Sequence, residues 1–165
     1  MADAHALFAT HRDGIFRYLS RIVGVGDAPD LTQEVFLRVS RSAVPSGPAE
    51  AQRAWIFRIA RNLALNYRRD AARRPALVEL GDAAHPAAQE VTAVVRDALA
   101  QLAPLDRDVF LLREAAGLSY DEIALACELS SDAVRSRLHR ARQALRLALA
   151  PRPRGASTIS MQVKP

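Results

Sequence analysis

The sequence predicts an all-α fold of two small helical domains joined by a flexible linker, the C-terminal one a four-helix domain with a helix-turn-helix. Half of the 165 residues are hydrophobic but only 5% are aromatic, which favours helices over sheets. Apolar residues recur at helical spacing on both sides of an acidic, proline-interrupted stretch. We therefore expect a first domain at 1–75, a linker at 76–90, a second domain at 91–150 and a disordered tail at 151–165.

Three amphipathic helices are expected in the first domain. The first spans 4–23, and the second is capped by Asp27, with Pro29 tolerated in its first turn. After a loop at 42–50 rich in proline, glycine and serine, the third runs from about 51 to 73. The apolar stripes expected to face the core are Phe8, Ile15, Leu19 and Ile22; Leu31, Val35, Phe36 and Val39; and Ile56, Ile59, Ala60, Leu63 and Tyr67.

The second domain is expected to hold two helices, at about 90–102 and 104–116, followed by the helix-turn-helix. Ser119 and Glu122 have the spacing of an S-x-x-E capping box, which begins the first helix of that motif. Ser130 or Ser131 can cap the final helix. Its inward stripe is spaced by four, three and four residues: Val134, Leu138, Ala141 and Leu145.

The final helix is expected to present a polar, arginine-rich outer face. Residues 135–146 hold five arginines and no acid, so ion pairs at i,i+4 spacing cannot form among them. An ordinary solvated helix is the alternative interpretation. An unpaired basic face indicates an anionic partner, and we favour a recognition helix that enters the DNA major groove.

Charge is distributed along the chain in three blocks. Residues 1–74 carry a net charge of +5, residues 75–128 carry −7, and residues 129–165 carry +7. Two basic segments that flank an acidic one predict two separate nucleic-acid contacts. The arginines of the 51–73 helix supply the first contact in this interpretation, with a solvated helix face as the alternative.

Several other classes of protein are not expected. The histidines are scattered, and neither a C-x-x-C pair nor a glycine-rich phosphate loop occurs, so we predict no enzyme, cofactor or metal site. The single cysteine, Cys127, is expected to be a buried thiol. Because no apolar run could cross a bilayer and the N-terminus is too polar for a signal peptide, we expect a cytoplasmic protein without membrane insertion.

Two blocks of this sequence resemble the extracytoplasmic-function (ECF) sigma factors of bacterial RNA polymerase, within the sigma-70 family. DAPDLTQEVFLRV, at 27–39, resembles the family's polymerase-binding helix, and AWIFRIARNLALNYRRDAARR, at 54–74, resembles its promoter-melting and minus-10-reading helix. The stretch at 102–145 resembles the minus-35-reading domain almost without gaps. Glu128 departs from the family, which usually has glycine there, so Glu128 must adopt a left-handed conformation or change the turn.

The resemblance implies a sigma factor that binds core RNA polymerase and promoter DNA, as a duplex at minus-35 and as a single strand at minus-10, often with an anti-sigma factor as a further partner. The implied polymerase contacts are Asp27, Asp30, Gln33 and Glu34. The implied minus-10 contacts are Arg58, Arg61, Asn62, Arg68, Arg69, Arg73 and Arg74. The implied minus-35 contacts are Ser131, Asp132, Arg135, Ser136, Arg137, His139, Arg140 and Arg142.

Two alternatives stay open at this point. A stand-alone helix-turn-helix regulator would use the same second domain, but it would protect duplex DNA by itself, as a dimer. Trp55 and Tyr67 can serve the core or stack on a base, and we favour the core because both lie on or beside the apolar stripe.

Overall fold

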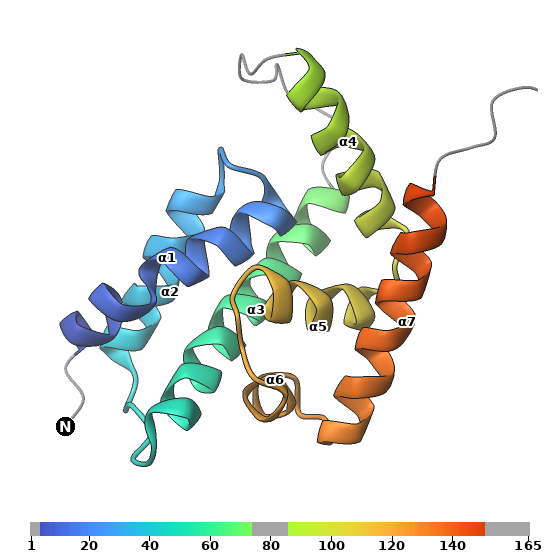
Figure 1. Cartoon of the computed structure of the whole chain (residues 1–165). Coiled ribbons are helices and arrows are strands. Elements are labelled where there is room, and N and C mark those ends of the chain that lie inside the picture. The colour runs from blue at the N-terminus through green and yellow to red at the C-terminus, as the bar shows by residue number, and fades with distance from the viewer. Residues whose placement is uncertain (1–3, 74–85, 151–165) are drawn as a thin grey trace, which may run out of the picture.

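The computed structural model describes residues 4–73 and 86–150, and every regular element in these ranges is a helix. In chain order (Figure 1) the helices are α1 (Ala4–Val23), α2 (Ala28–Arg41), α3 (Ala49–Arg73), α4 (Pro86–Ala100), α5 (Pro104–Glu114), α6 (Tyr120–Cys127) and α7 (Ser131–Leu149). The all-α prediction is confirmed. Helix α4 begins inside the range predicted as a linker, while 76–85 and the predicted tail lie outside the described residues. None of the described helices is long and apolar enough to span a bilayer.

Helices α1, α2 and α3 pack on one another and form the first core. Its centre holds Ile15, Leu19, Val35 and Ile56, all from the predicted stripes and fully buried. Several predicted stripe members lie at the margin instead and are only partly buried: Phe8, Ile22, Leu31, Phe36, Ile59 and Tyr67. Tyr18 and Phe57 are fully buried although the stripes omit them, because α1 and α3 also contact the second half of the chain and so bury wider arcs. Trp55 and Tyr67 both pack against the core, as expected.

The start of α2 differs from the prediction. Asp27 stands at the N-cap position, but its side chain makes no capping hydrogen bond. Its backbone is already helical, with φ −94° and ψ −17°, whereas a capping residue is typically extended. The Asp27 carboxylate instead accepts a hydrogen bond from the Tyr67 hydroxyl, and this contact joins the start of α2 to α3.

The helix-turn-helix forms as its local signals predict. Ser119 Oγ accepts from the Glu122 amide at 3.2 Å, and the Glu122 carboxylate accepts from the Ser119 amide at 2.7 Å, which completes the capping box. Glu128 closes α6 in the left-handed conformation, with φ 57°. Ser130 then caps α7 by accepting from the Ala133 amide, and the four residues of the predicted stripe are buried.

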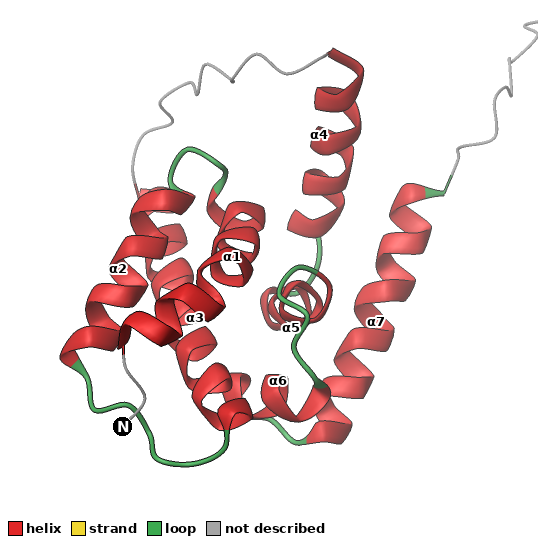
Figure 2. Ribbon diagram, turned by 60° about the vertical axis from the view of Figure 1, so that its left-hand side comes forward, coloured by secondary structure: helices red, strands yellow, loops and turns green. Residues whose placement is uncertain are grey.

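The two halves of the chain lie against each other. Helix α3 packs beside α6 in both views, and α1 contacts α5 (Figures 1 and 2). Helices α4 and α5 pack with α6 and α7, so the second half is the expected four-helix unit (Figure 2). The α3–α6 contact brings the arginines of the first half close to the acids of the second.

Candidate nucleic-acid interface

Helix α7 presents an exposed polar face opposite its buried stripe. Four of the predicted contacts lie on this face and are exposed: Asp132, Arg135, Ser136 and His139. Arg135 Nη1 lies 3.3 Å from Asp132 Oδ1, a weak surface pair that leaves the guanidinium accessible. Ser131 sits at the edge of the face, where its hydroxyl donates to Asp121 at 2.7 Å. The outer face thus combines hydroxyl, imidazole and guanidinium groups, which can contact base edges and phosphates.

The prediction of an unpaired basic face on α7 is wrong. Asp106 of α5 accepts hydrogen bonds from Arg137 at 2.7 Å and from Arg140 at 3.1 Å, and Glu114 accepts from Arg142 at 2.8 Å. These acids precede their arginines by about thirty residues, so spacing within the helix could not reveal them. Burial alone would raise the pKa of Asp106, but the two arginine hydrogen bonds outweigh burial and lower that pKa.

Three of the arginines of α3 are also paired, but with acids of the other half of the chain. Arg58 Nη1 lies 2.7 Å from Glu128, Arg61 Nε lies 3.0 Å from Asp108 Oδ2, and Arg53 Nη1 lies 3.3 Å from Glu122. Of the remaining predicted minus-10 contacts, Asn62, Arg69 and Arg73 are exposed and Arg68 is partly buried. Arg74 lies outside the described residues.

The Arg61–Asp108 pair lies in a buried polar patch between the two halves. The Asp108 side chain is only 3% exposed, and burial raises its pKa although Arg61 opposes this effect. The fully buried Tyr18 hydroxyl has no hydrogen-bond partner among the described residues, and burial, together with the nearby Asp108 charge, raises its pKa. Cys127 borders the same patch as a buried thiol, as predicted, and burial raises its pKa to about 11.

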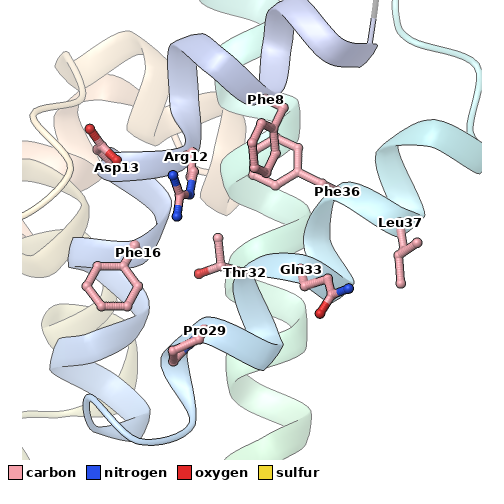
Figure 3. A pocket seen from close by; sticks show the side chains of 9 residues that line it. All are labelled: Phe8, Arg12, Asp13, Phe16, Pro29, Thr32, Gln33, Phe36 and Leu37. Atoms are coloured by element: carbon pink, nitrogen blue, oxygen red, sulfur yellow. The ribbon is translucent and has the colours of Figure 1, made fainter.

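A groove of about 760 Å³ lies between α1 and α2, on the surface that the sequence assigns to polymerase (Figure 3). Its apolar lining comes from Phe8, Phe16, Phe36 and Leu37, and the rings of Phe8 and Phe36 meet edge to face at 4.7 Å. Gln33 is the one predicted polymerase contact that lines the groove. Phe16 and Leu37 were missed by the sequence analysis, although large apolar residues that fall outside a core stripe were the available signal.

The other three predicted polymerase contacts lie near the groove, and each has different surroundings. Asp30 is exposed on α2, and Glu34 Oε1 accepts from Arg38 at 2.8 Å one turn later. Asp27 is turned toward α3 by its bond to Tyr67. The surface therefore consists of an apolar groove beside carboxylate and amide groups, a combination suited to an amphipathic helix of a protein partner.

Two helical units, one ending in a helix-turn-helix and both carrying arginine-rich helices, define a DNA-binding transcription protein. Residues 7–74 match the family model of sigma-70 region 2, and residues 92–145 match that of sigma-70 region 4. The chain belongs to the sigma-70 family and, within it, to the ECF sigma factors.

Curated relatives of known class cover most of the chain. This chain is 38% identical over 152 residues to the ECF sigma factor SigE of Mycolicibacterium smegmatis. The match covers 85% of this chain and 59% of SigE. The chain is 34% identical to SigL of Mycobacterium tuberculosis, covering 87% of each chain. It is 31% identical to the sigma-E factor of Escherichia coli, covering 84% of this chain and 82% of that one.

Solved structures of sigma factors share the fold. CnrH, in complex with the cytosolic domain of CnrY, superposes with a TM-score of 0.68 at 29% identity, over 88% of this chain and 86% of CnrH. RpoE of Bartonella quintana, in complex with the anti-sigma factor NepR, superposes with a TM-score of 0.63 over 88% of this chain and 95% of RpoE. At 20% identity, the second likeness concerns the fold alone.

Proposed function

We propose that this chain binds core RNA polymerase and directs it to promoters, with region 2 at 1–75, a linker at 76–90 and region 4 at 91–150. The observation that carries the proposal is the match to both sigma-70 regions, in order, on one chain. Both regions carry an arginine-rich helix, which supports two DNA contacts. In this proposal the protein works in the cytoplasm and catalyses no reaction itself.

The exposed face of α7 reads the minus-35 duplex. Arg135, Ser136 and His139 are placed to reach base edges or phosphates, because all three are exposed on one face of a helix whose other face is buried. Arg137, Arg140 and Arg142 contact the flanking backbone from the sides of the helix, and Ser131 and Asp132 lie at its entry to the groove.

Helix α3 holds the strand that becomes single at minus-10. Its proposed contacts are Arg58, Arg61, Asn62, Arg68, Arg69, Arg73 and Arg74. A row of guanidinium groups along one helix can track successive phosphates of an extended strand. The loop expected at 42–50 ends at 48, just before α3 begins at Ala49, and it supplies small polar groups and backbone amides for an extruded base.

The groove between α1 and α2 receives a helix of the polymerase. Gln33 lines the groove, while Asp30 and Glu34 lie on the same helix α2 and supply polar groups beside it. Asp27 belongs to the same surface and, through Tyr67, fixes α2 on α3. An anti-sigma factor is a further proposed partner, since CnrH was solved with CnrY and RpoE with NepR.

Run-off transcription with purified core polymerase on a genomic promoter library tests the proposal. We expect the chain to associate with core polymerase and to start transcription at a defined set of promoters. An Asp30→Arg, Gln33→Ala variant is expected to lose that association while staying folded. A chain that fails to join the polymerase but protects its DNA site alone would instead be a stand-alone regulator.

A further inference from the structure

A single carboxylate beneath the DNA-reading helix holds two of its arginines. Asp106 lies in the first turn of α5, and α5 packs against α7 (Figure 1). Its oxygens accept from Arg137 Nη1 at 2.7 Å and from Arg140 Nε and Nη2 at 3.1 and 3.2 Å. Because the Asp106 side chain is only 9% exposed, salt screens these pairs less than it screens a surface pair.

The three side chains together keep an excess of positive charge. Burial opposes the ionisation of Asp106, but the hydrogen bonds from the two arginines lower its pKa below the ordinary value. One carboxylate therefore faces two guanidinium groups, and one positive charge is left over. Among the described residues, no hydrogen bond engages Nη2 of Arg137 or Nη1 of Arg140. These donors suit the oxygens of a phosphate, which would balance the charge.

Arg140 borders the face of α7 that is proposed to read bases. It lies one turn after Ser136, so the two side chains project from the same side of the helix. The Arg140 side chain is 55% exposed, whereas that of Arg137 is 27% exposed. A free guanidinium at this place could extend to a guanine and donate to its O6 and N7. Asp106 instead engages the Nε–Nη2 edge of Arg140 and draws the group toward α5.

We propose that Asp106 is a specificity-determining positioning residue: it holds Arg140 beside the phosphate backbone and so keeps that arginine out of base reading. This inference deepens the proposed function and rests on it, because the minus-35 duplex is the ligand of this face. The arginines held by Asp106 then fix the register of α7 in the groove, since phosphate contacts position a helix without carrying sequence information. Selection of the sequence is left to the exposed residues Arg135, Ser136 and His139.

The experiment measures base preference with the full chain and core polymerase. A promoter that the parent holoenzyme transcribes is converted into a library with a randomised minus-35 element, and each template carries a barcode in its transcribed region. Sequencing of the run-off transcripts gives the output for every minus-35 sequence. The test variants are Asp106→Asn, Asp106→Glu, Arg140→Ala and the double variant Asp106→Asn, Arg140→Ala. Asp97→Asn, on α4 and 71% exposed, is the control for net charge.

Asp106→Asn releases Arg140 from its partner. Templates with guanine at one minus-35 position are then expected to gain about tenfold in transcription over templates with the other bases there. Asp106→Glu keeps the charge and is expected to keep the parent's preference, whereas a role in packing alone would favour the isosteric asparagine. Asp97→Asn is expected to match the parent. A folded Asp106→Asn variant with the parent's base preference would overturn the proposal.

Arg140→Ala tests the same idea without threatening the fold, because the side chain that it truncates is exposed. We expect a loss of about threefold that is uniform across the library, since a phosphate contact adds affinity without choice. The double variant is expected to show no gain for guanine, because the released arginine is absent. A base-specific loss in Arg140→Ala, or a guanine gain that persists in the double variant, would refute the positioning role.

Failure of this inference is distinguishable from failure of the proposed function. A parent protein that starts no promoter-directed transcription refutes the sigma-factor function, and the inference falls with it. A parent protein that transcribes, with an Asp106→Asn variant that keeps its base preference, refutes the positioning role alone.

Discussion

Helices α3 and α7 are both rich in arginine, but they find their acidic partners in different places. Helix α7 pairs with Asp106 and Glu114, which lie on α5 of its own four-helix unit. Helix α3 pairs with Asp108, Glu122 and Glu128, which lie in the other half of the chain. One set of acids therefore orients a helix within its domain, while the other joins two domains.

The difference bears on what each helix can bind. The pairs of α7 involve its flanks and leave the outer face with Arg135, Ser136 and His139 exposed. The pairs of α3 use Arg58 and Arg61, which are proposed DNA contacts, as are the paired arginines on the flanks of α7. The two helices therefore differ in the source of the acids: those paired with α7 come from α5 of the same unit, whereas those paired with α3 come from the other half of the chain.

The largest expected effect comes from breaking the packing that places α7 on its own unit. Leu138 is 1% exposed, so Leu138→Ala leaves a cavity and is expected to lower the free energy of unfolding by about 3 kcal/mol. Urea denaturation measures this loss. Leu147→Ala on the same helix is the matched control and is expected to change stability by less than about 0.5 kcal/mol, since that side chain is exposed. Equal losses would contradict the assigned inward face.

The next effect separates DNA reading from polymerase binding. Arg135→Ala is expected to reduce promoter-directed run-off transcription about tenfold, as expected for one guanidinium at a base edge. Association with core polymerase, measured by gel filtration, should stay unchanged. Arg96→Ala on α4 removes the same charge outside α7 and should transcribe normally. A parallel loss of transcription and polymerase association in Arg135→Ala would refute the division of labour.

A pH titration distinguishes Asp106 from Asp108. Folding lowers the pKa of Asp106, so its stabilising contribution is full above its ordinary pKa of about 3.9 and is lost as the pH falls below that value. The stability gap between the parent and Asp106→Asn should therefore shrink on acidification. Folding raises the pKa of Asp108, so the folded parent takes up a proton there at a higher pH than the unfolded chain does. The free energy of unfolding of the parent should therefore rise relative to that of Asp108→Asn as the pH falls through the raised pKa. Chemical denaturation over a pH series measures both gaps, and identical trends would contradict the two environments.

The smallest effect concerns the turn that carries Glu128. Its φ of 57° is costly for glutamate and easy for glycine, so Glu128→Gly is expected to raise the free energy of unfolding by about 0.5–1 kcal/mol. The Arg58 pair that this change removes is exposed and adds little stability. Glu128→Gln removes the charge but keeps the strained backbone, and it should give no gain in thermal or urea denaturation.

Local chemistry made the helix-turn-helix predictable. The capping box at Ser119, the cap at Ser130 and the buried stripe of α7 depend on residues within a few positions of each other. Even the left-handed conformation of Glu128 was one of the two outcomes expected where the family has glycine. These features are encoded by spacing, and spacing can be read directly from the sequence.

Contacts between residues that are far apart in the sequence could not be predicted from spacing. Arg61 and Asp108 are 47 residues apart, and no periodicity links them. The block charges of +5 and −7 were interpreted only as a sign of nucleic-acid contacts, and they do not indicate which side chains of the two segments meet. The groove between α1 and α2 was missed for the same reason, because its walls come from separate helices.

The lone thiol offers a natural reporter of local opening. Cys127 is buried beside the patch that contains Arg61 and Asp108, and its raised pKa of about 11 keeps it protonated at neutral pH. A protonated, covered sulfur reacts slowly with alkylating reagents. A reagent reaches the sulfur only when the packing around α6 opens. The rate of alkylation in the unmodified protein would therefore measure how often that packing opens.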